Sequence, residues 1–295
     1  MRKLFIVVET EKDHRFRRLS QEVRKRKRMQ LESINAYTSL VTLEGISSKN
    51  RAIEISKNDM FWVLSNSMIN HYLIKCLSGK KEKIRIWPDV AAVDFSDKFL
   101  TAKFFEEIGI ATPGSVLLNR RDYDEAIDYL GGFPLVIKKN IGTIGRYVEL
   151  VRSKKEIESF MELVFNNAKA NDIPANRIAF LLQKYIPECK GEDIRVLCLN
   201  GKIIGAIRRI AGDGGFKANI SLGGTAEPYE VDRELNKMCK EIINKGKIFY
   251  AGLDFLKTNE GYSAIEVNTS AQFKGFETAT GINVAEKIID QLIKK

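Results

Sequence analysis

Short apolar runs alternate with segments of helical periodicity over the first third of the chain. The strand-like runs are KLFIVVE, AIEIS, FWVLSN and KIRIW, and helical patterns cover about residues 16–34 and 68–78. Strand-length apolar runs that alternate with helices are typical of an α/β domain with a largely parallel sheet. The pattern therefore predicts an N-terminal α/β domain over residues 1–93.

The pattern changes after Trp87-Pro88-Asp89. The segment DKFLTAKFFEEIGIATPG predicts an amphipathic helix that ends at Gly109, because glycine commonly follows the last helical turn. Strands are then expected in SVLL, FPLVIKK, YVELV and AFLLQKYI, with helices between them. These elements form a second predicted lobe over residues 94–186.

The last third of the chain, residues 187–295, carries two hairpin patterns. One is centred on Asn200-Gly201 and the other on Asn259–Gly261. Asn-Gly between two β-rich runs is a strong hairpin signal because both residues tolerate the left-handed backbone of a tight turn. We therefore expect this third lobe to be mainly antiparallel.

Polar side chains interrupt the second strand of the later hairpin. Glu266 and Asn268 share one face of SAIEVN, because side chains alternate along a strand. If the hairpin loop is three residues long, Asp254 lies opposite Glu266. Three oxygen donors without His or Cys nearby favour Mg²⁺ over zinc. On spacing alone, a structural ion pair or cap network is an equally good explanation.

Two other strand ends carry polar groups. Lys138 ends the run LVIK and is followed by the loop Gly142–Gly145. Such a lysine can neutralise phosphate oxygens while free backbone N–H groups surround them, although a solvated lysine before a flexible turn is the commoner arrangement. Gln183-Lys184-Tyr185 ends another strand, and Asp193 and Arg195 share one face of the next.

Composition restricts the remaining chemistry. The 295 residues include only two histidines, His14 and His71, so histidine metal sites and histidine-based triads are not expected. No apolar run is long enough to span a membrane, and no membrane partner is expected. The unpaired spacing of the cysteines suggests reduced thiols in a cytoplasmic protein. They are Cys76, Cys189, Cys198 and Cys239.

The net charge of +10 indicates an anionic partner. Much of the excess lies in RFRRLSQEVRKRKR, residues Arg15–Arg28. A solvated helix face is the favoured interpretation, because Phe16 is the only aromatic residue in this segment and nucleic-acid patches usually contain more. The consecutive residues Arg24–Arg28 would surround a helix and could not all face one ligand.

Taken in order, these segments resemble the RimK-type ATP-grasp carboxylate–amine (α-L-glutamate) ligases over residues 94–295. The likeness is strongest in GLDFLKTNEGYSAIEVNTSAQFKGFETATGINVAEKII. RRIAGDGGFKANISLGGTAEP is similar to a family loop with a basic residue, an Asn and a Gly-Gly pair. The resemblance implies an α/β ATP-grasp fold of α+β lobes that follows a parallel pre-ATP-grasp domain.

The resemblance also implies roles for individual residues. ATP would be bound by Lys98, Lys138, Gly142, Thr143, Gly145, Gln183, Lys184, Tyr185 and Asp193. Phosphate or acyl-phosphate groups would be held by Arg209, Lys217 and Asn219. Two Mg²⁺ ions, or Mn²⁺ in their place, would be bound by Asp254, Glu266 and Asn268. The Gly-rich loop Ile210–Gly224 would close over the nucleotide.

Two segments depart from the family pattern. Arg146-Tyr147 stand in the phosphate loop where small residues are usual, and Ser270-Ala271-Gln272 replaces Ser-Pro-Gly where the substrate is expected. The implied activity is ATP-dependent amide formation through an acyl phosphate, with a carboxylate and an amine as substrates. Three substrate classes stay open, namely glutamate joined to a peptide, protein or cofactor, an amino-group carrier protein, and side-chain crosslinks in a peptide. A homo-oligomer is also left open by the sequence. The alternative class is a non-catalytic nucleotide- or nucleic-acid-binding protein with this fold, and nucleic acid is the less favoured partner.

Overall fold

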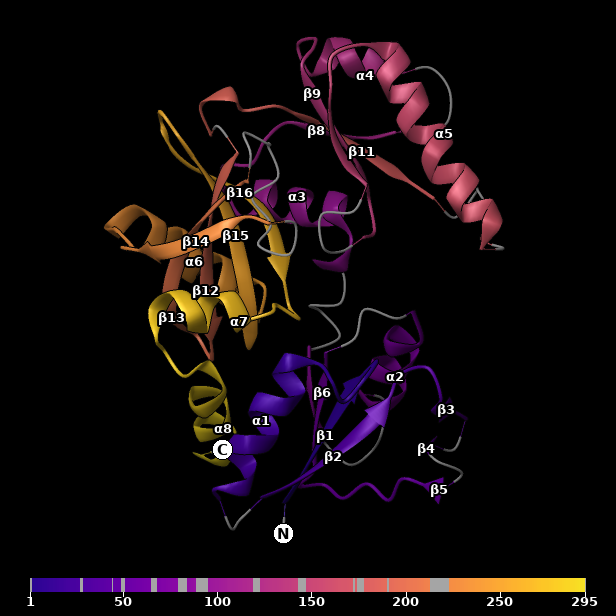
Figure 1. Ribbon diagram of the computed structural model, residues 1–295, viewed down its shortest axis with the longest axis vertical. Coiled ribbons are helices and arrows are strands. Elements are labelled where there is room, and N and C mark those ends of the chain that lie inside the picture. The colour runs from indigo at the N-terminus through magenta and orange to yellow at the C-terminus, as the bar shows by residue number, and fades with distance from the viewer. Residues whose placement is uncertain are drawn as a thin grey trace.

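The computed structural model has three groups of elements, each built on its own main sheet (Figure 1). It describes residues 2–26, 29–43, 45–48, 51–64, 68–78, 84–88, 95–118, 123–142, 147–171, 173, 178–189, 191–212 and 223–294. No helix in these ranges combines the length and apolar character needed to cross a membrane. The lobe boundaries drawn from the sequence remain predictions.

The N-terminal group is a parallel sheet of order β2-β1-β6-β7, as the alternation of runs predicts. Its strands are β1 (Arg2–Val8), β2 (Met29–Asn35), β6 (Met60–Val63) and β7 (Arg85–Trp87), and its helices are α1 (His14–Arg24) and α2 (Met68–Ser78). A small antiparallel sheet lies beside it, formed by β3 (Leu40–Val41), β4 (Ile46–Ser48) and β5 (Arg51–Ala52).

Two predicted elements of this group are wrong. The helix expected over residues 16–34 ends at Arg24, and Met29–Asn35 instead pairs with β1 along its whole length. The strand expected in AIEIS is largely irregular, since β5 ends at Ala52. Its isoleucines Ile53 and Ile55 still pack against the buried core, so their apolar character reflects burial without sheet pairing.

The central group is an antiparallel sheet of order β10-β9-β11-β8. Its elements are β8 (Ser115–Leu118), α4 (Asp124–Tyr129), β9 (Leu135–Lys139), β10 (Val148–Val151), α5 (Lys154–Ala170) and β11 (Phe180–Lys184). Helix α3 (Lys98–Glu107) comes before them and packs mainly against strand β16 (Gly261–Asn268) of the C-terminal sheet, where Phe105 is buried. The four predicted strands are confirmed. Helix α3 stops before Gly109, whose φ of 71° allows the chain to turn away.

The C-terminal group is a five-stranded antiparallel sheet of order β14-β13-β12-β15-β16. Its elements are the short helix η3 (Pro187–Cys189), β12 (Glu192–Leu199), β13 (Lys202–Ile210), β14 (Thr225–Tyr229), α6 (Arg233–Lys245), β15 (Tyr250–Thr258), β16 (Gly261–Asn268), α7 (Lys274–Thr280) and α8 (Val284–Lys294). Asn200 and Gly201 turn the first hairpin with φ values of 49° and 77°, as their sequence predicts.

The second hairpin has the predicted pairing of Asp254 with Glu266 but a different loop and register. Thr258 pairs with Gly261, so the loop has two residues and the predicted three-residue loop is wrong. Ile265 is left unpaired as a β-bulge, and this extra residue shifts the register. Asp254 therefore pairs with Glu266, and the predicted juxtaposition of the two carboxylates is confirmed.

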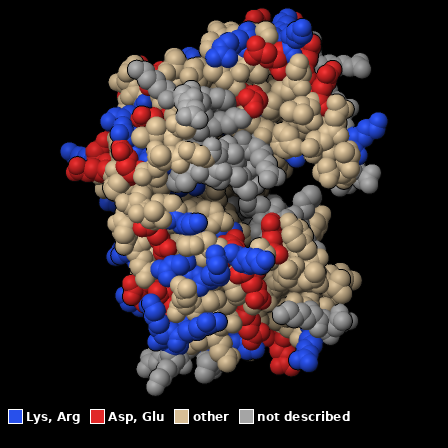
Figure 2. All heavy atoms as spheres, in the orientation of Figure 1, with Lys and Arg blue, Asp and Glu red and all other residues tan. Residues whose placement is uncertain are grey.

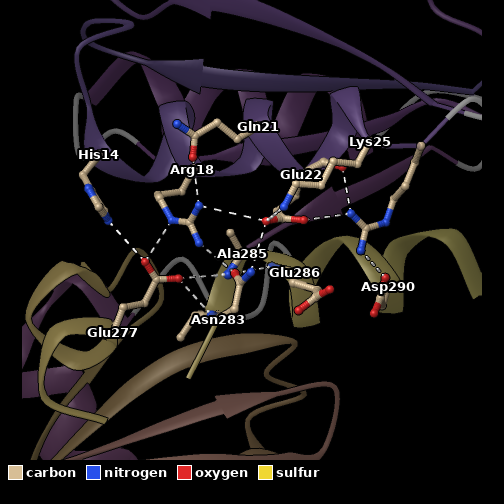
Figure 3. A network of polar contacts seen from close by, with 12 residues as sticks. His14, Arg18, Gln21, Glu22, Lys25, Glu277, Asn283, Ala285, Glu286 and Asp290 are labelled. Atoms are coloured by element: carbon tan, nitrogen blue, oxygen red, sulfur yellow. Dashed lines mark hydrogen bonds and ion pairs between the residues drawn. The ribbon is translucent and has the colours of Figure 1, made fainter. Parts of the chain in front are cut away.

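Helix α1 joins the N-terminal group to the C-terminal helices. Apolar residues of α1, such as Leu19 and Val23, share one core with Ile288 and Leu292 of α8. Around this core, Arg18 donates to Glu277 at 3.1 Å, and Arg26 donates to Asp290 and Glu22 (Figure 3). Helices α1 and α8 are thereby held side by side (Figure 1).

These contacts correct the interpretation of the basic run as a solvated helix face. Arg15 is buried and donates to Asp13 and to the carbonyl oxygens of Leu64 and Ser270. Among the described basic residues of the run, which end at Arg26, Arg17, Arg24 and Lys25 are exposed. Figure 2 shows basic side chains gathered on the face where α1 and α8 lie, with acidic ones among them. Much of the excess charge therefore has a structural role.

Glu22 lies at the centre of this interface and is fully buried. Its carboxylate accepts from Lys25 at 2.8 Å, Arg26 at 3.0 Å and the Asn283 amide at 3.1 Å (Figure 3). Burial alone would raise the pKa of Glu22, but these hydrogen bonds lower it from 4.5 to about 2. The ionised carboxylate thus stabilises the fold above its unfolded pKa, and this contribution is lost as the pH falls from 4.5 toward 2.

We expect Glu22→Gln to lower the free energy of unfolding at neutral pH by about 1–3 kcal/mol, because buried donors lose a charged acceptor. Urea unfolding should show this difference shrinking as the pH falls toward 2. Glu106→Gln, which breaks an exposed pair with Lys103, is the control and should change stability by less than about 1 kcal/mol. Equal effects of the two substitutions at all pH values would contradict the assignment.

Candidate active site

Three of the sequence-predicted site residues meet at one end of the hairpin β15–β16. Asp254 is 2% exposed, whereas Glu266 and Asn268 are half-buried. Asn268 uses its side-chain oxygen to accept from the Ser270 backbone N–H at 3.1 Å. Within the described part of the chain, Glu266 makes no hydrogen bond or ion pair. It therefore has acceptor capacity for a ligand.

Asp254 is bound instead by two arginines from other strands of the same sheet. Arg195 on β12 pairs directly with Asp254 in the register and binds both carboxylate oxygens, with Nε–Oδ1 and Nη2–Oδ2 distances of 2.7 and 2.6 Å. Arg209 on β13 donates to Asp254 Oδ2 at 2.9 Å and to both oxygens of Asp193 at 2.5 and 2.7 Å. The four side chains form a continuous ion-pair network across three strands, in the order Asp193, Arg209, Asp254 and Arg195.

Burial and charge have opposite effects on the pKa values in this ion-pair network. Burial would raise the pKa of Asp254, but the charges and hydrogen bonds of Arg195 and Arg209 hold it below its usual value. Burial dominates at Asp193, whose pKa is raised despite Arg209. The pKa of Arg209 is raised, since the two aspartates outweigh its burial. Arg209 is therefore a fixed positive charge between two carboxylates.

Lys138 approaches this cluster from the central sheet. Its side chain is buried, and Nζ donates to Gln183 Oε1 at 2.8 Å, while the Gln183 amide donates to Ser115. Burial and the nearby charge of Lys98 lower the pKa of Lys138 to about 8, and the charge of Glu266 opposes them. Lys138 of the central sheet and Glu266 of the C-terminal sheet thus act on each other across the seam between the two sheets.

The position of Lys98 follows from a helix cap. Asp97 accepts from the Leu100 N–H at 2.9 Å and from the Asn140 amide at 2.6 Å, and Asn140 accepts from the Phe99 N–H. These bonds fix the first turn of α3 to the end of β9. Lys98 then donates from Nζ to the Gly142 carbonyl at 2.7 Å, beside the predicted phosphate loop.

Two residues expected to bind ATP, Lys184 and Tyr185, lie at the end of β11 and directly after it. The Lys184 N–H donates to the Gly114 carbonyl at 2.9 Å. Lys184 and Tyr185 line a hollow of about 970 Å³, together with residues 108–114, helix α6 and the tip of the hairpin β15–β16. Lys138, Asp254 and Glu266 are not among its lining residues, so this hollow is separate from the carboxylate cluster.

Several predicted site residues lie outside the described ranges, namely Thr143, Gly145, Lys217 and Asn219. Most of the expected lid, Ile210–Gly224, lies outside them as well. The structure adds residues that the motifs do not single out as site residues: Ser115, Asn140 and Arg195. Of these three, Arg195 alone could have been identified from the sequence, because it shares a strand face with Asp193.

The donor set suits a hard cation. The described residues hold no cluster of three or more His, Cys, Asp or Glu side chains arranged for a metal. Glu266 and Asn268 offer oxygen atoms on the same hairpin as Asp254, and oxygen-only donors are those that Mg²⁺ prefers. Glu266 is the donor with most free capacity, because most acceptor positions of Asp254 are already used.

We expect Arg209→Gln to lower the free energy of unfolding by about 3–5 kcal/mol, because it leaves two buried carboxylates short of a countercharge. Arg208→Gln, at the adjacent position, is the matched control. Arg208 is 40% exposed and pairs with the exposed Glu227, so its loss should cost less than about 1 kcal/mol. Urea denaturation of both variants tests this. Similar losses of unfolding free energy would show that the buried ion-pair network is unimportant for the fold.

Comparisons with known proteins agree with this architecture. Residues 95–292 match the family described as the RimK-like ATP-grasp domain. A probable alpha-L-glutamate ligase 2 of Shewanella amazonensis is 34% identical over 199 residues, which are 67% of this chain and 63% of that protein. A probable alpha-L-glutamate ligase 1 of Shewanella oneidensis is 33% identical over the same shares. The chain thus spans 63% of the length of these relatives.

Solved structures resemble nearly the whole chain. A RimK domain protein ATP-grasp from Sphaerobacter thermophilus superposes with a TM-score of 0.76 at 16% identity, over 98% of both chains. The macrocyclase MdnC of Microcystis aeruginosa, bound with precursor peptide MdnA, has a TM-score of 0.69 at 13% identity and covers 99% of this chain and 100% of its own. These likenesses confirm the predicted ATP-grasp fold, and the family match over residues 95–292 shows that the chain belongs to the RimK-like ATP-grasp family.

Proposed function

We propose that the protein is an ATP-dependent carboxylate–amine ligase that forms an amide bond and releases ADP and phosphate. The observation that carries this proposal is the seam in which buried Lys138, with the charge of Lys98 nearby, interacts electrostatically with Glu266. Positive groups on one side and oxygen donors on the other suit a nucleotide triphosphate with its cation. Asp193, Lys184 and Tyr185 are proposed to bind the ribose and adenine.

The reaction would proceed in two balanced steps. A carboxylate oxygen of the acceptor attacks the γ-phosphorus, the bond to the bridging oxygen breaks, and ADP leaves. An amine then attacks the acyl carbon, phosphate leaves, and the amine loses a proton. Cations bound at Asp254, Glu266 and Asn268 would neutralise phosphate charge.

The side chains of the protein contribute position and charge to both steps. Lys138 bears its proton below a pKa of about 8, and an anionic phosphate beside it favours the protonated form. Arg209 is already held rigidly between Asp193 and Asp254, so its charge needs no reorganisation during the reaction. Lys217 and Asn219 are proposed to hold the acyl phosphate under the loop Ile210–Gly224, which would exclude water.

The substrate pair is an acceptor carboxylate on a peptide, protein or cofactor and the amine of an amino acid such as glutamate. The names of the curated relatives, probable alpha-L-glutamate ligases, support glutamate. The peptide-bound relative MdnC supports a peptide acceptor. A non-catalytic nucleotide-binding role is less well supported, because it gives no reason for a half-buried carboxylate, Glu266, that makes no hydrogen bond or ion pair with the described residues.

We expect purified protein to release ADP from Mg-ATP when glutamate and an acceptor peptide are both present, with the peptide gaining the mass of a glutamyl residue. Glu266→Gln should lower this rate at least about 100-fold, because it removes the charge that would bind the cation. Its melting temperature should stay unchanged, since Glu266 has no hydrogen-bond partner within the described residues.

The control is Glu162→Gln, an exposed glutamate on α5 that does not line the hollow beside Lys184 and Tyr185, and this variant should retain full activity. A Glu266→Gln protein that turns over normally but melts at a lower temperature would identify Glu266 as a structural carboxylate. Nucleotide binding without ADP release by the wild-type protein, across acidic and amine substrates, would instead favour the non-catalytic role.

A further inference from the structure

Arg195 lies over a glycine on the neighbouring strand. Leu197 and Gly252 are partners in the β12–β15 register, and Arg195 pairs with Asp254 two residues further along. A Cβ atom added to Gly252 would lie 3.2 Å from both Cδ and Nε of Arg195 and 2.9 Å from Cβ of Ala271. The missing side chain at Gly252 therefore provides the space in which Arg195 reaches Asp254.

The two arginines that bind Asp254 differ in what else they bind. Arg209 gives one hydrogen bond to Asp254 and two to Asp193. Arg195 gives both of its hydrogen bonds to Asp254, and its side chain is 13% exposed. A two-pronged bond to both oxygens fixes the plane of a carboxylate, which a single hydrogen bond does not. Arg195 is therefore the group that sets the orientation of Asp254.

The hydrogen bonds from the two arginines also leave the Asp254 carboxylate with few unused acceptor positions. Each carboxylate oxygen can accept about two hydrogen bonds in its plane. Oδ2 accepts one from Arg195 and one from Arg209, whereas Oδ1 accepts one from Arg195. Among hydrogen bonds between described residues, Oδ1 alone retains an unused acceptor position. The orientation imposed by Arg195 thus decides where that position lies relative to Glu266, the partner of Asp254 across the hairpin.

We propose that Arg195 is a positioning residue for the cation site, which it serves by holding the carboxylate of Asp254, and that residue 252 is glycine to admit the Arg195 side chain. This inference rests on the proposed function, because it takes Asp254 as a cation ligand. Groups that orient a metal ligand commonly change metal affinity 10- to 100-fold when they are removed. Lysine cannot replace this arginine fully, because an ammonium group lacks the planar fork that binds both oxygens.

The test is Mn²⁺ binding at a fixed saturating concentration of ADP, measured from the electron paramagnetic resonance of the free ion. Arg195→Gln should raise the half-saturating Mn²⁺ concentration by about 10- to 100-fold per folded molecule. Arg195→Lys should give an intermediate value. Gly252→Ala should shift binding in the same direction although Arg195 is still present. Arg208→Gln, an exposed arginine on β13, should bind as the wild type does.

An unchanged half-saturating concentration in Arg195→Gln, with only a lower melting temperature, would overturn the proposal and leave Arg195 a structural partner. If Arg195→Gln does not fold, the same measurement on Arg195→Lys decides, and wild-type binding there overturns the proposal equally. A wild-type protein that binds no Mn²⁺ beyond that held by ADP and releases no ADP from ATP contradicts the proposed function itself, and this role with it.

Discussion

The alternation of two aspartates and two arginines across β12, β13 and β15 is the interaction on which the site depends. A buried carboxylate without a countercharge is costly, and each aspartate here meets an arginine at 2.5–2.9 Å. The contacts need Arg195 opposite Asp254 and Arg209 opposite Asp193, which the strand register provides. The β15–β16 register places Asp254 opposite Glu266, so one sheet provides both the ion pairs and the arrangement of the oxygen donors.

The N-terminal group contributes to the same region from the other side. The buried guanidinium of Arg15 donates to the Ser270 carbonyl, two residues after Asn268, and to the Leu64 carbonyl at the end of β6. Salt bridges of Arg18 in α1 with Glu277, and of Arg26 just after α1 with Asp290, hold the same two parts of the chain together. The segment Ser270–Gln272, where the sequence departs from the family pattern, therefore rests directly on the N-terminal group.

Periodicity and motif order were sufficient for the strands of the central sheet, both hairpins and the family. They failed where the outcome depended on tertiary partners. Met29–Asn35 has a sequence that also suits a helix, and it became a strand because β1 offered a parallel edge. The basic run was judged by its own composition, whereas its acidic partners Glu277 and Asp290 lie more than two hundred residues away.

The site was predictable to the same extent. The pairing of Asp254 with Glu266 was expected, but it arises from a two-residue loop and a bulge at Ile265, and no local signal distinguishes this combination from a three-residue loop. The role of Arg195 depends on a space above Gly252 that only the packed sheet reveals. Asn140 was missed because its function is to bind the cap of a helix that begins forty residues earlier.

The central claim is that the seam between the two sheets activates a carboxylate as an acyl phosphate, and isotope transfer tests it most directly. A peptide ending in glutamate, its carboxylates labelled with ¹⁸O, would be incubated with the protein, Mg-ATP and free glutamate. The account predicts that one ¹⁸O atom passes from the peptide to each phosphate released, as mass spectrometry of the phosphate would show. Phosphate that carries no label from the peptide, and takes its oxygen from water instead, would contradict it.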